Sequence, residues 1–302
     1  MAKRTSLLDW LILAGLIVAW GSSFAMTKIA VAHLSAAWIM ALRLAIAACV
    51  LVPYAMLRGH SFNLPKETWT KYSWLGLIGH AAPFFLISWG TNFVPSGVSG
   101  LLMGTIPLFL VVLAHFFLVN EQLTVPKALG FVLGFAGIFV LIGPKAILNL
   151  SMSGEALAGE LAILLGCLCY SVHGVTAKRF GFSNPILQTA AVCATAAAMG
   201  LIFAGLTDPL DPREIPGAAL WSVAGLGLLP TAFASLLMYV LIQRAGPSFV
   251  AYSNYLVPVY ALLFGALLMH EPLSANIAFA LALILSGIAI SRWSGFRPRP
   301  SK

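Results

Sequence analysis

Ten apolar runs, each long enough to cross a lipid bilayer as a helix, dominate this chain of 302 residues. Crossing about 30 Å of hydrocarbon takes roughly 20 helical residues. The runs cover residues 8–27, 34–57, 72–93, 96–118, 125–143, 157–179, 185–206, 217–243, 247–270 and 275–293. Only 9% of the residues are charged, whereas soluble domains average about 25%. The pattern predicts an all-α membrane protein with ten transmembrane helices.

Several other classes of protein do not fit this chain. The first run, LLDWLILAGLIVAWGSSF, exceeds the apolar core of a signal peptide, and we expect it to remain in the protein. The net charge of +8 is spread over short loops and both tails, which favours membrane orientation over nucleic-acid binding. We expect no cofactor, no metal site and no disulfide framework, because the four cysteines all lie inside apolar runs: Cys49, Cys167, Cys169 and Cys193.

The basic residues between the runs predict the orientation in the membrane. With ten spans both termini share one side, and thirteen of the lysines and arginines fall there: Lys3, Arg4, Arg58, Lys66, Lys71, Lys127, Lys178, Arg179, Arg244, Arg292, Arg297, Arg299 and Lys302. The other side carries three: Lys28, Lys145 and Arg213. Positive charge concentrates on the cytoplasmic side of membrane proteins. Both termini are therefore predicted to be cytoplasmic.

The sequence repeats itself at an offset of 150 residues. WGSSFAMTK at 20–28 aligns with YSVHGVTAK at 170–178, and NEQLT at 120–124 aligns with HEPLS at 270–274. We infer two five-helix repeats, residues 1–148 and 149–302, that form one integral unit. Because five is an odd number, the second repeat enters the membrane from the opposite side, and the repeat is inverted. Two inverted halves that exchange conformations are the architecture of an alternating-access transporter.

Three features recur or stand out in these halves: an aromatic residue with a lysine downstream in the first span, an arginine in AWIMALRLAIAA of the second, and a glutamate before the fifth. In this pattern the chain resembles the EamA-type transporters of the drug/metabolite transporter superfamily. It is most similar to bacterial inner-membrane exporters of aromatic and other amino acids, some of which also extrude methyl viologen. The resemblance implies export from cytoplasm to periplasm. One departure is that Cys193 stands where the second half would repeat Arg43.

Polar and aromatic residues inside the spans are the candidate substrate-binding residues. In the third span four of them recur at i, i+4, i+8 and i+12 and share one helix face: His80, Phe84, Ser88 and Asn92. The first and sixth spans place aromatic and polar residues near the midplane, where inverted repeats form their site: Trp20, Ser23, Tyr170 and His173. The candidates from the third, eighth and ninth spans are Trp89, Tyr239, Tyr252, Asn254 and Tyr255. Hydrogen bonding between helices would explain the same residues, and both interpretations remain open.

Two cations in the spans and two glutamates between them admit structural interpretations as well. Arg43 lies well inside the second span and either attracts a substrate carboxylate or ties helices together through backbone carbonyls. Lys28 is close enough to the outer interface to act as an anchor there, and contact with the substrate is the alternative. Glu121 and Glu271 are interpreted as helix-end residues, just before the N-cap residues Thr124 and Ser274.

Four prolines mark the helices expected to move. They lie inside the third, fourth, eighth and ninth spans, where a proline frees a backbone carbonyl and loosens the helix: Pro83, Pro107, Pro230 and Pro258. We expect these residues to act as kinks or gates.

The resemblance implies an amino acid exporter, and we expect broad specificity and a monomer in the lipid bilayer. No Asp or Glu lies near the middle of any span, since Asp9 and Glu160 stand near span ends. This favours uniport, or coupling through histidine, over a carboxylate proton relay. The alternative is efflux of organic cations or other small metabolites, with proton coupling. An enzyme is not expected, because the chain has no HExxH or GxSxG motif.

Overall fold

The computed structural model describes residues 6–118, 124–142, 154–181, 184–208, 215–250 and 252–293, and the regular structure of these residues is helical. Some residues of the sequence predictions lie outside the described residues: Lys3, Arg4, Glu121, Lys145, Arg213, Arg297, Arg299 and Lys302. The predicted helical class is confirmed for the part of the chain that the structure describes.

Each predicted span is occupied by helix, and several spans are built of two or three pieces. The elements are α1 (Leu7–Val31), α2 (Ala36–Leu57), α3 (Lys66–Gly76), η1 (Leu77–Ala81), α4 (Ala82–Thr91), α5 (Ser96–Met103), α6 (Ile106–Phe117), α7 (Val125–Ile142), α9 (Gly154–Phe180), α10 (Pro185–Thr207), α11 (Gly217–Leu226), η3 (Gly227–Phe233), α12 (Ala234–Ala245), α13 (Pro247–Val250), α14 (Ser253–Leu268) and α15 (Ala275–Trp293). Among the described residues, six helical units are long and apolar enough to cross a membrane, and α7, α14 and α15 are shorter apolar helices. The chain is a multi-pass membrane protein.

The surface that these helices present is apolar where it faces outward. Large side chains are exposed on several different helices, with Leu206 82%, Trp221 80% and Leu267 72% exposed. In water so many exposed apolar side chains would favour aggregation, whereas in lipid they are in their preferred solvent. The outward faces are therefore the lipid-facing faces.

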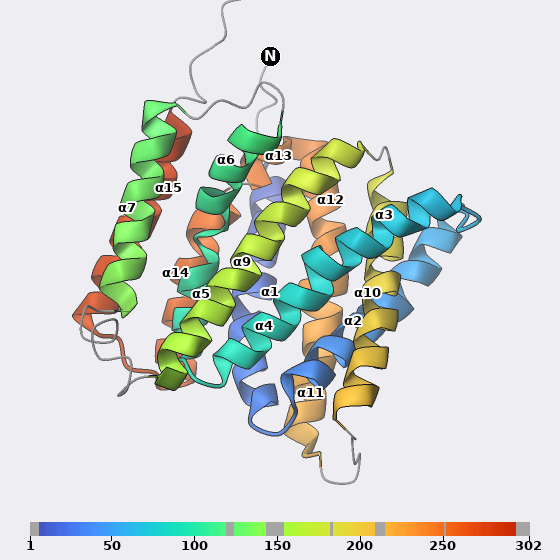
Figure 1. Cartoon of the computed structure of the whole chain (residues 1–302), viewed down its shortest axis with the longest axis horizontal. Helices are drawn as coiled ribbons and strands as arrows, with labels where there is room; N and C mark the ends of the chain where they lie inside the picture. The colour runs from blue at the N-terminus through green and yellow to red at the C-terminus, as the bar shows by residue number, and fades with distance from the viewer. Residues whose placement is uncertain are drawn as a thin grey trace, which may run out of the picture.

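Pairs of helices that occupy equivalent places in the sequence pack against each other. At one edge of the molecule α7 lies beside α15, at the other α2 lies beside α10, and α1 passes through the middle (Figure 1). Glycines allow the α7–α15 contact to be close: a Cβ added at Gly287 would lie 2.5 Å from the Gly130 carbonyl oxygen and 2.8 Å from the Gly134 nitrogen. Small residues at such positions are the usual basis of helix packing in membranes.

Polar side chains at helix starts set where several helices begin. Ser6 and Asp9 form a capping box at the start of α1, and Asn184 caps α10. Ser274 accepts from the Ile277 amide at 3.4 Å, and the Ala128 amide donates to the Thr124 carbonyl at 3.0 Å. Thr124 and Ser274 thus immediately precede α7 and α15 as predicted.

Two π-helical turns interrupt the third and eighth units at positions 150 residues apart, η1 from Leu77 and η3 from Gly227. In each, a backbone amide donates one residue further back than in an α-helix: Ala82 N–H to the Leu77 carbonyl, and Ala234 N–H to the Leu229 carbonyl. Single π turns inside α-helices occur frequently at functional sites. The hydrophobic pattern of the sequence does not predict them.

We expect Gly287→Ala to destabilise the protein, because the added methyl group would overlap backbone atoms of α7. Overpacking of this kind costs about 1–3 kcal/mol. The midpoint of thermal unfolding in detergent, followed by tryptophan fluorescence, should fall.

The matched control is Gly205→Ala on the exposed side of α10, where a Cβ meets no atom within 4 Å. Alanine is favoured over glycine in a helix by about 1 kcal/mol, so this midpoint should stay or rise. Equal midpoints for the two variants would contradict the close α7–α15 contact.

Candidate functional site

Aromatic rings from the third and sixth helical units gather around Phe84. The Arg43 guanidinium carbon lies 3.8 Å from the centroid of the Phe84 ring. The rings of His80 and Tyr170 approach Phe84 edge-on, with centroids at 5.7 and 6.2 Å. The His173 ring lies 5.9 Å from that of His80. We call these five residues, Arg43, His80, Phe84, Tyr170 and His173, the central cluster.

The polar residues of the central cluster lie among the helices but are not fully buried. Phe84 is 8% exposed, and the other four side chains are partly exposed. The Nδ1 atom of His80 is buried, and it has no hydrogen-bond partner among the described residues. A buried polar atom without a partner is costly and rare in proteins. Such an atom is expected where a ligand or water completes the hydrogen bonding.

The π turn η3 fixes the position of Arg43. Pro230 has no N–H group, so the Leu226 carbonyl four residues earlier lacks its usual helical donor. The Thr231 hydroxyl donates to that carbonyl at 2.7 Å and accepts from Arg43 Nε at 2.8 Å. A hydroxyl with its hydrogen committed presents its lone pairs to the guanidinium. Thr231 is a site residue that sequence reasoning missed, although a threonine directly after a proline in an apolar run is a signal for it.

The first helix of each half bonds to backbone in, or just before, the π turn of the other half. Trp20 Nε1 donates to the Pro230 carbonyl at 3.2 Å, and His173 Nδ1 lies 3.2 Å from the Leu75 carbonyl. A Cβ at Gly79 in η1 would overlap the His173 ring, so glycine permits this approach. Since a carbonyl only accepts, the hydrogen on this histidine belongs on Nδ1. Trp20 and His173 therefore join the two halves beside the central cluster.

The remaining predicted residues of the first and third units lie in different surroundings. Ser23 donates to the Trp20 carbonyl of its own helix at 2.6 Å. Ser88 is buried at 3% exposure. The Trp89 ring lies 4.9 Å from the Phe93 ring, and Asn92 is exposed just after the end of α4. The predicted face of the third unit thus brings His80 and Phe84 into contact, while Asn92 lies beyond the helix.

The predicted residues of the eighth and ninth units contact other groups. Tyr252 is 44% exposed, and its ring lies 6.2 Å from that of Trp10 near the start of α1. Asn254 is partly exposed, and Tyr255 packs against the buried residues around Leu101 and Ile284. Tyr239 is packed against the apolar core beside α2 and α10, and its hydroxyl accepts from Gln243 at 3.0 Å.

Three of the four predicted prolines lie in or next to a π turn or a helix break, and the fourth lies within a helix. Pro83 follows η1, Pro230 lies inside η3, and Pro258 lies within α14. Pro107 follows the break between α5 and α6. Their role in movement remains a prediction.

Lys28 and Glu271 bind the two ends of the loop between α4 and α5. The Lys28 ammonium donates to the carbonyls of Thr91, Asn92 and Val94 at 2.8, 3.2 and 2.9 Å. The Glu271 carboxylate accepts from the amides of residues 96 and 97 at 2.7 and 2.9 Å. Lysine at a helix C-terminus and glutamate at a helix N-terminus both complement the helix dipole. These contacts agree with the predicted anchoring role of Lys28 and helix-end role of Glu271.

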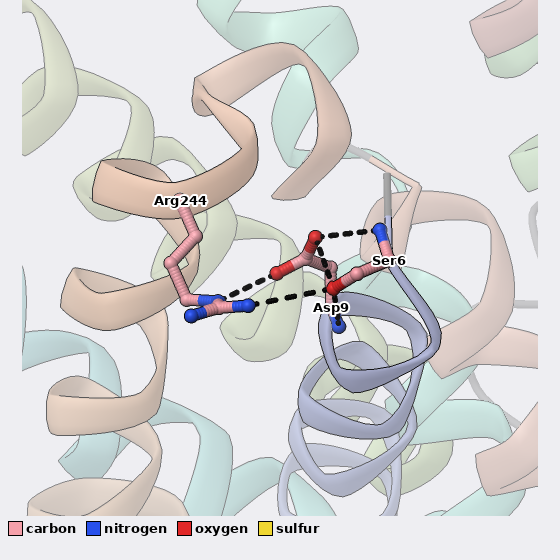
Figure 2. Close-up of polar contacts among 3 residues, drawn as sticks. All are labelled: Ser6, Asp9 and Arg244. Carbon is pink, nitrogen blue, oxygen red and sulfur yellow. Dashed lines mark hydrogen bonds and ion pairs between the residues drawn. The ribbon is translucent and has the colours of Figure 1, made fainter. Parts of the chain in front are cut away.

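The other end of α1 carries an ion pair with the eighth unit (Figure 2). Arg244 Nε donates to the Asp9 carboxylate at 2.7 Å, and the second carboxylate oxygen accepts from the Ser6 amide and hydroxyl at 2.8 Å each. Asp9 is 5% exposed. The ends of α1 are therefore fastened by polar contacts to α12 and to α4.

A multi-pass helical bundle with a polar cluster among its helices has the structure of a membrane transport protein. The model of the EamA-like transporter family matches residues 8–143 and again residues 157–293. The chain belongs to the EamA-like transporter family, and it is a transporter rather than an enzyme.

Relatives and a solved structure agree with this family. The uncharacterized transporter YoaV of Bacillus subtilis is 29% identical over 91% of this chain and 93% of its own length. The aromatic amino acid exporter YddG of Ancylobacter novellus is 27% identical over 83% of this chain and 85% of its own. An S-adenosylmethionine/S-adenosylhomocysteine transporter of Chlamydia muridarum is 23% identical over 92% and 89%. A crystal structure with 24% identity has the same fold, with a TM-score of 0.67 over 95% of this chain and 97% of that one.

We expect Lys28→Met to lower stability without changing substrate affinity, because all three N–H groups of the ammonium have backbone acceptors. Hydrogen bonds to charged groups contribute about 1.5–3 kcal/mol each, part of which methionine packing would offset. Thermal unfolding in detergent and the half-saturation constant for transport measure the two effects.

Lys66→Met, at the exposed start of α3, serves as the control and should leave both quantities unchanged. A raised half-saturation constant for Lys28→Met with an unchanged unfolding midpoint would instead place Lys28 in contact with substrate.

Proposed function

We propose that the protein exports amino acids, including aromatic and neutral ones, from the cytoplasm across a bacterial inner membrane. The observation that supports this most directly is the central cluster, which combines aromatic rings, neutral polar groups and one cation at the meeting point of both halves. Aromatic rings offer an apolar surface to a side chain and a face to an ammonium group, the latter worth about 0.5–2 kcal/mol.

Alternating access by two inverted repeats is the proposed mechanism, with both termini in the cytoplasm. Three observations support it: the family model matches twice, η1 and η3 recur 150 residues apart, and equivalent helices α2 and α10 pack together. The thirteen-to-three distribution of basic residues supports the cytoplasmic termini. The kinked third, fourth, eighth and ninth units are the proposed moving parts.

The similar proteins support an amino acid head group as the common feature of the substrate. Two of them are named for aromatic amino acids and for S-adenosylmethionine. These compounds share an α-amino and an α-carboxylate group, attached to bodies of different size. A cluster that holds the head group and leaves the body against adaptable rings would give broad specificity and weak affinity.

Uniport is the proposed mode of transport. Among the described residues, no carboxylate contacts the central cluster, and the two ion pairs of the described chain join Lys71 to Glu67 and Arg244 to Asp9. Without an acidic group there, a proton relay would have to use the histidines. An accumulated metabolite provides its own gradient for export.

Organic cations are the less favoured substrates. The positive charge of Arg43 lies against Phe84, the ring that a flat cation would stack on. At an effective dielectric constant of about 20, two unit charges 4 Å apart repel by about 4 kcal/mol. A dication such as methyl viologen is therefore expected to bind poorly to the central cluster.

We expect purified protein in liposomes to catalyse counterflow of labelled phenylalanine, methionine and threonine with equal pH on both sides. Protein-free liposomes provide the background. Transport that appears only with an imposed pH gradient would contradict uniport, and transport of methyl viologen without any amino acid would contradict the proposed substrate class.

His80→Ala is expected to alter the half-saturation constant while the protein still folds. Its buried Nδ1 has no partner in the described part of the chain, so the substitution removes no hydrogen bond seen there. Tyr252→Ala in the same assay distinguishes a site confined to the central cluster from one that extends to the ninth unit. Unchanged transport by both variants would move the site elsewhere.

A further inference from the structure

Arg43 has hydrogen-bonding capacity that the described residues do not use. A guanidinium carries five N–H groups, and in Arg43 the Nε–H donates to Thr231. The N–H groups of its two terminal nitrogens have no acceptor among the described residues. Arg43 as a residue is of intermediate burial, not fully buried. Arg43 is therefore held through its Nε atom, and its terminal N–H groups remain available as donors among the described residues.

The charge of Arg43 likewise has no carboxylate partner among the described residues. The acidic residues that form ion pairs in the described chain, Glu67 and Asp9, pair with Lys71 and Arg244 instead. A cation inside a membrane is costly unless an anion or several carbonyl groups face it. A residue that only tied helices together would use its terminal nitrogens on backbone carbonyls, as Lys28 uses its ammonium. Arg43 makes no such contact with the described residues.

The groups around Arg43 hold it in one orientation. The guanidinium carbon lies over the Phe84 ring, and the Thr231 hydroxyl, which donates to the Leu226 carbonyl, accepts from Nε. A guanidinium so held presents its terminal N–H groups as a planar pair. Two parallel N–H groups match the two oxygens of a carboxylate. The rings of His80 and Tyr170 contact Phe84 in T-shaped geometry.

We propose that Arg43 binds the carboxylate of the transported solute through its terminal N–H groups, with Phe84 and Thr231 as the residues that position it. This inference rests on the proposed function and adds the group that selects the substrate. It makes an anionic head group, rather than the ammonium or the side chain, the main requirement for binding. Cys193, at the equivalent position of the second half, donates to the Leu44 carbonyl at 3.6 Å, so the site has one such charge.

The test compares phenylalanine with compounds that lack one of its two charged groups. In wild-type counterflow of labelled phenylalanine, 3-phenylpropionate, which keeps the carboxylate, should compete. Phenethylamine, which keeps the ammonium, should compete at least about 10-fold more weakly, since a charged hydrogen bond is worth about 1.5–3 kcal/mol and 1.4 kcal/mol is tenfold. Stronger competition by phenethylamine would overturn the proposal without any variant.

Variants at Arg43 provide the second part of the test. Arg43→Gln should raise the half-saturation constant for phenylalanine about 10-fold or more, and leave the inhibition constant of phenethylamine within about 2-fold. Arg43→Lys should lie between, because it keeps the charge but loses the planar pair. Arg58→Gln, at the exposed end of the same helix, is the control and should resemble the wild type.

The outcomes separate this inference from the proposed function. Absence of amino acid counterflow by the wild type would overturn both. Amino acid counterflow in which Arg43→Gln weakens phenylalanine and phenethylamine equally would overturn the inference alone and leave Arg43 with a structural role. If Arg43→Gln does not fold, the competition by 3-phenylpropionate and phenethylamine in the wild type decides the matter.

Discussion

Every backbone carbonyl inside a membrane needs a donor from the protein, and this constraint governs the centre of the structure. The π turns η1 and η3 and the proline in η3 disturb the helical hydrogen bonds there. Side chains take over: Thr231 bonds the Leu226 carbonyl, and Trp20 bonds the Pro230 carbonyl from another helix. The same bonds then position Arg43 and join the two halves. The site is thus a consequence of how the irregular backbone is satisfied.

Much of the architecture follows from the sequence because it depends on hydrophobic length and on repetition. Ten runs gave ten helical units, and the capping role of Ser274 and the anchoring role of Lys28 were readable from their places at helix ends. The π turns were not readable, because one extra residue in a turn leaves an all-apolar pattern unchanged. The third unit, which contains η1, therefore matches its predicted helix face only in part. His80 and Phe84 are in contact, whereas Asn92 lies past the end of α4.

The central cluster was only partly accessible to sequence reasoning for a related reason. The polar residues near midplane could be selected, since they are rare in apolar runs. Which of them meet depends on helix rotation and crossing, and these are set by contacts such as Gly79 against His173 that no single run encodes. Arg43 was visible as an intramembrane charge. Its partner Thr231, 188 residues away, came from the fold.

The two halves of the sequence differ at the position of the intramembrane arginine. Arg43 and Cys193 occupy equivalent positions, and the bond from Cys193 to the Leu44 carbonyl places them on packed neighbouring helices. A symmetric pair of arginines would repel each other there. Under the proposed inverted-repeat architecture, duplication accounts for the shared frame, and divergence at this position accounts for Arg43 having no counterpart at residue 193.

The fastening of α1 at both ends has a mechanical consequence. Asp9 and Lys28 are separated by about 28 Å along the helix, close to the thickness of the hydrocarbon layer, and each end is bonded to a different unit, α12 or α4. With both contacts formed, α1 cannot tilt relative to α12 and α4 at the same time. If either α12 or α4 rotated away from α1, the polar contact to that helix would break, and α1 would turn about the contact that remains. Under the proposed alternating-access mechanism, the relative strengths of the two attachments would bias which side of the membrane opens first.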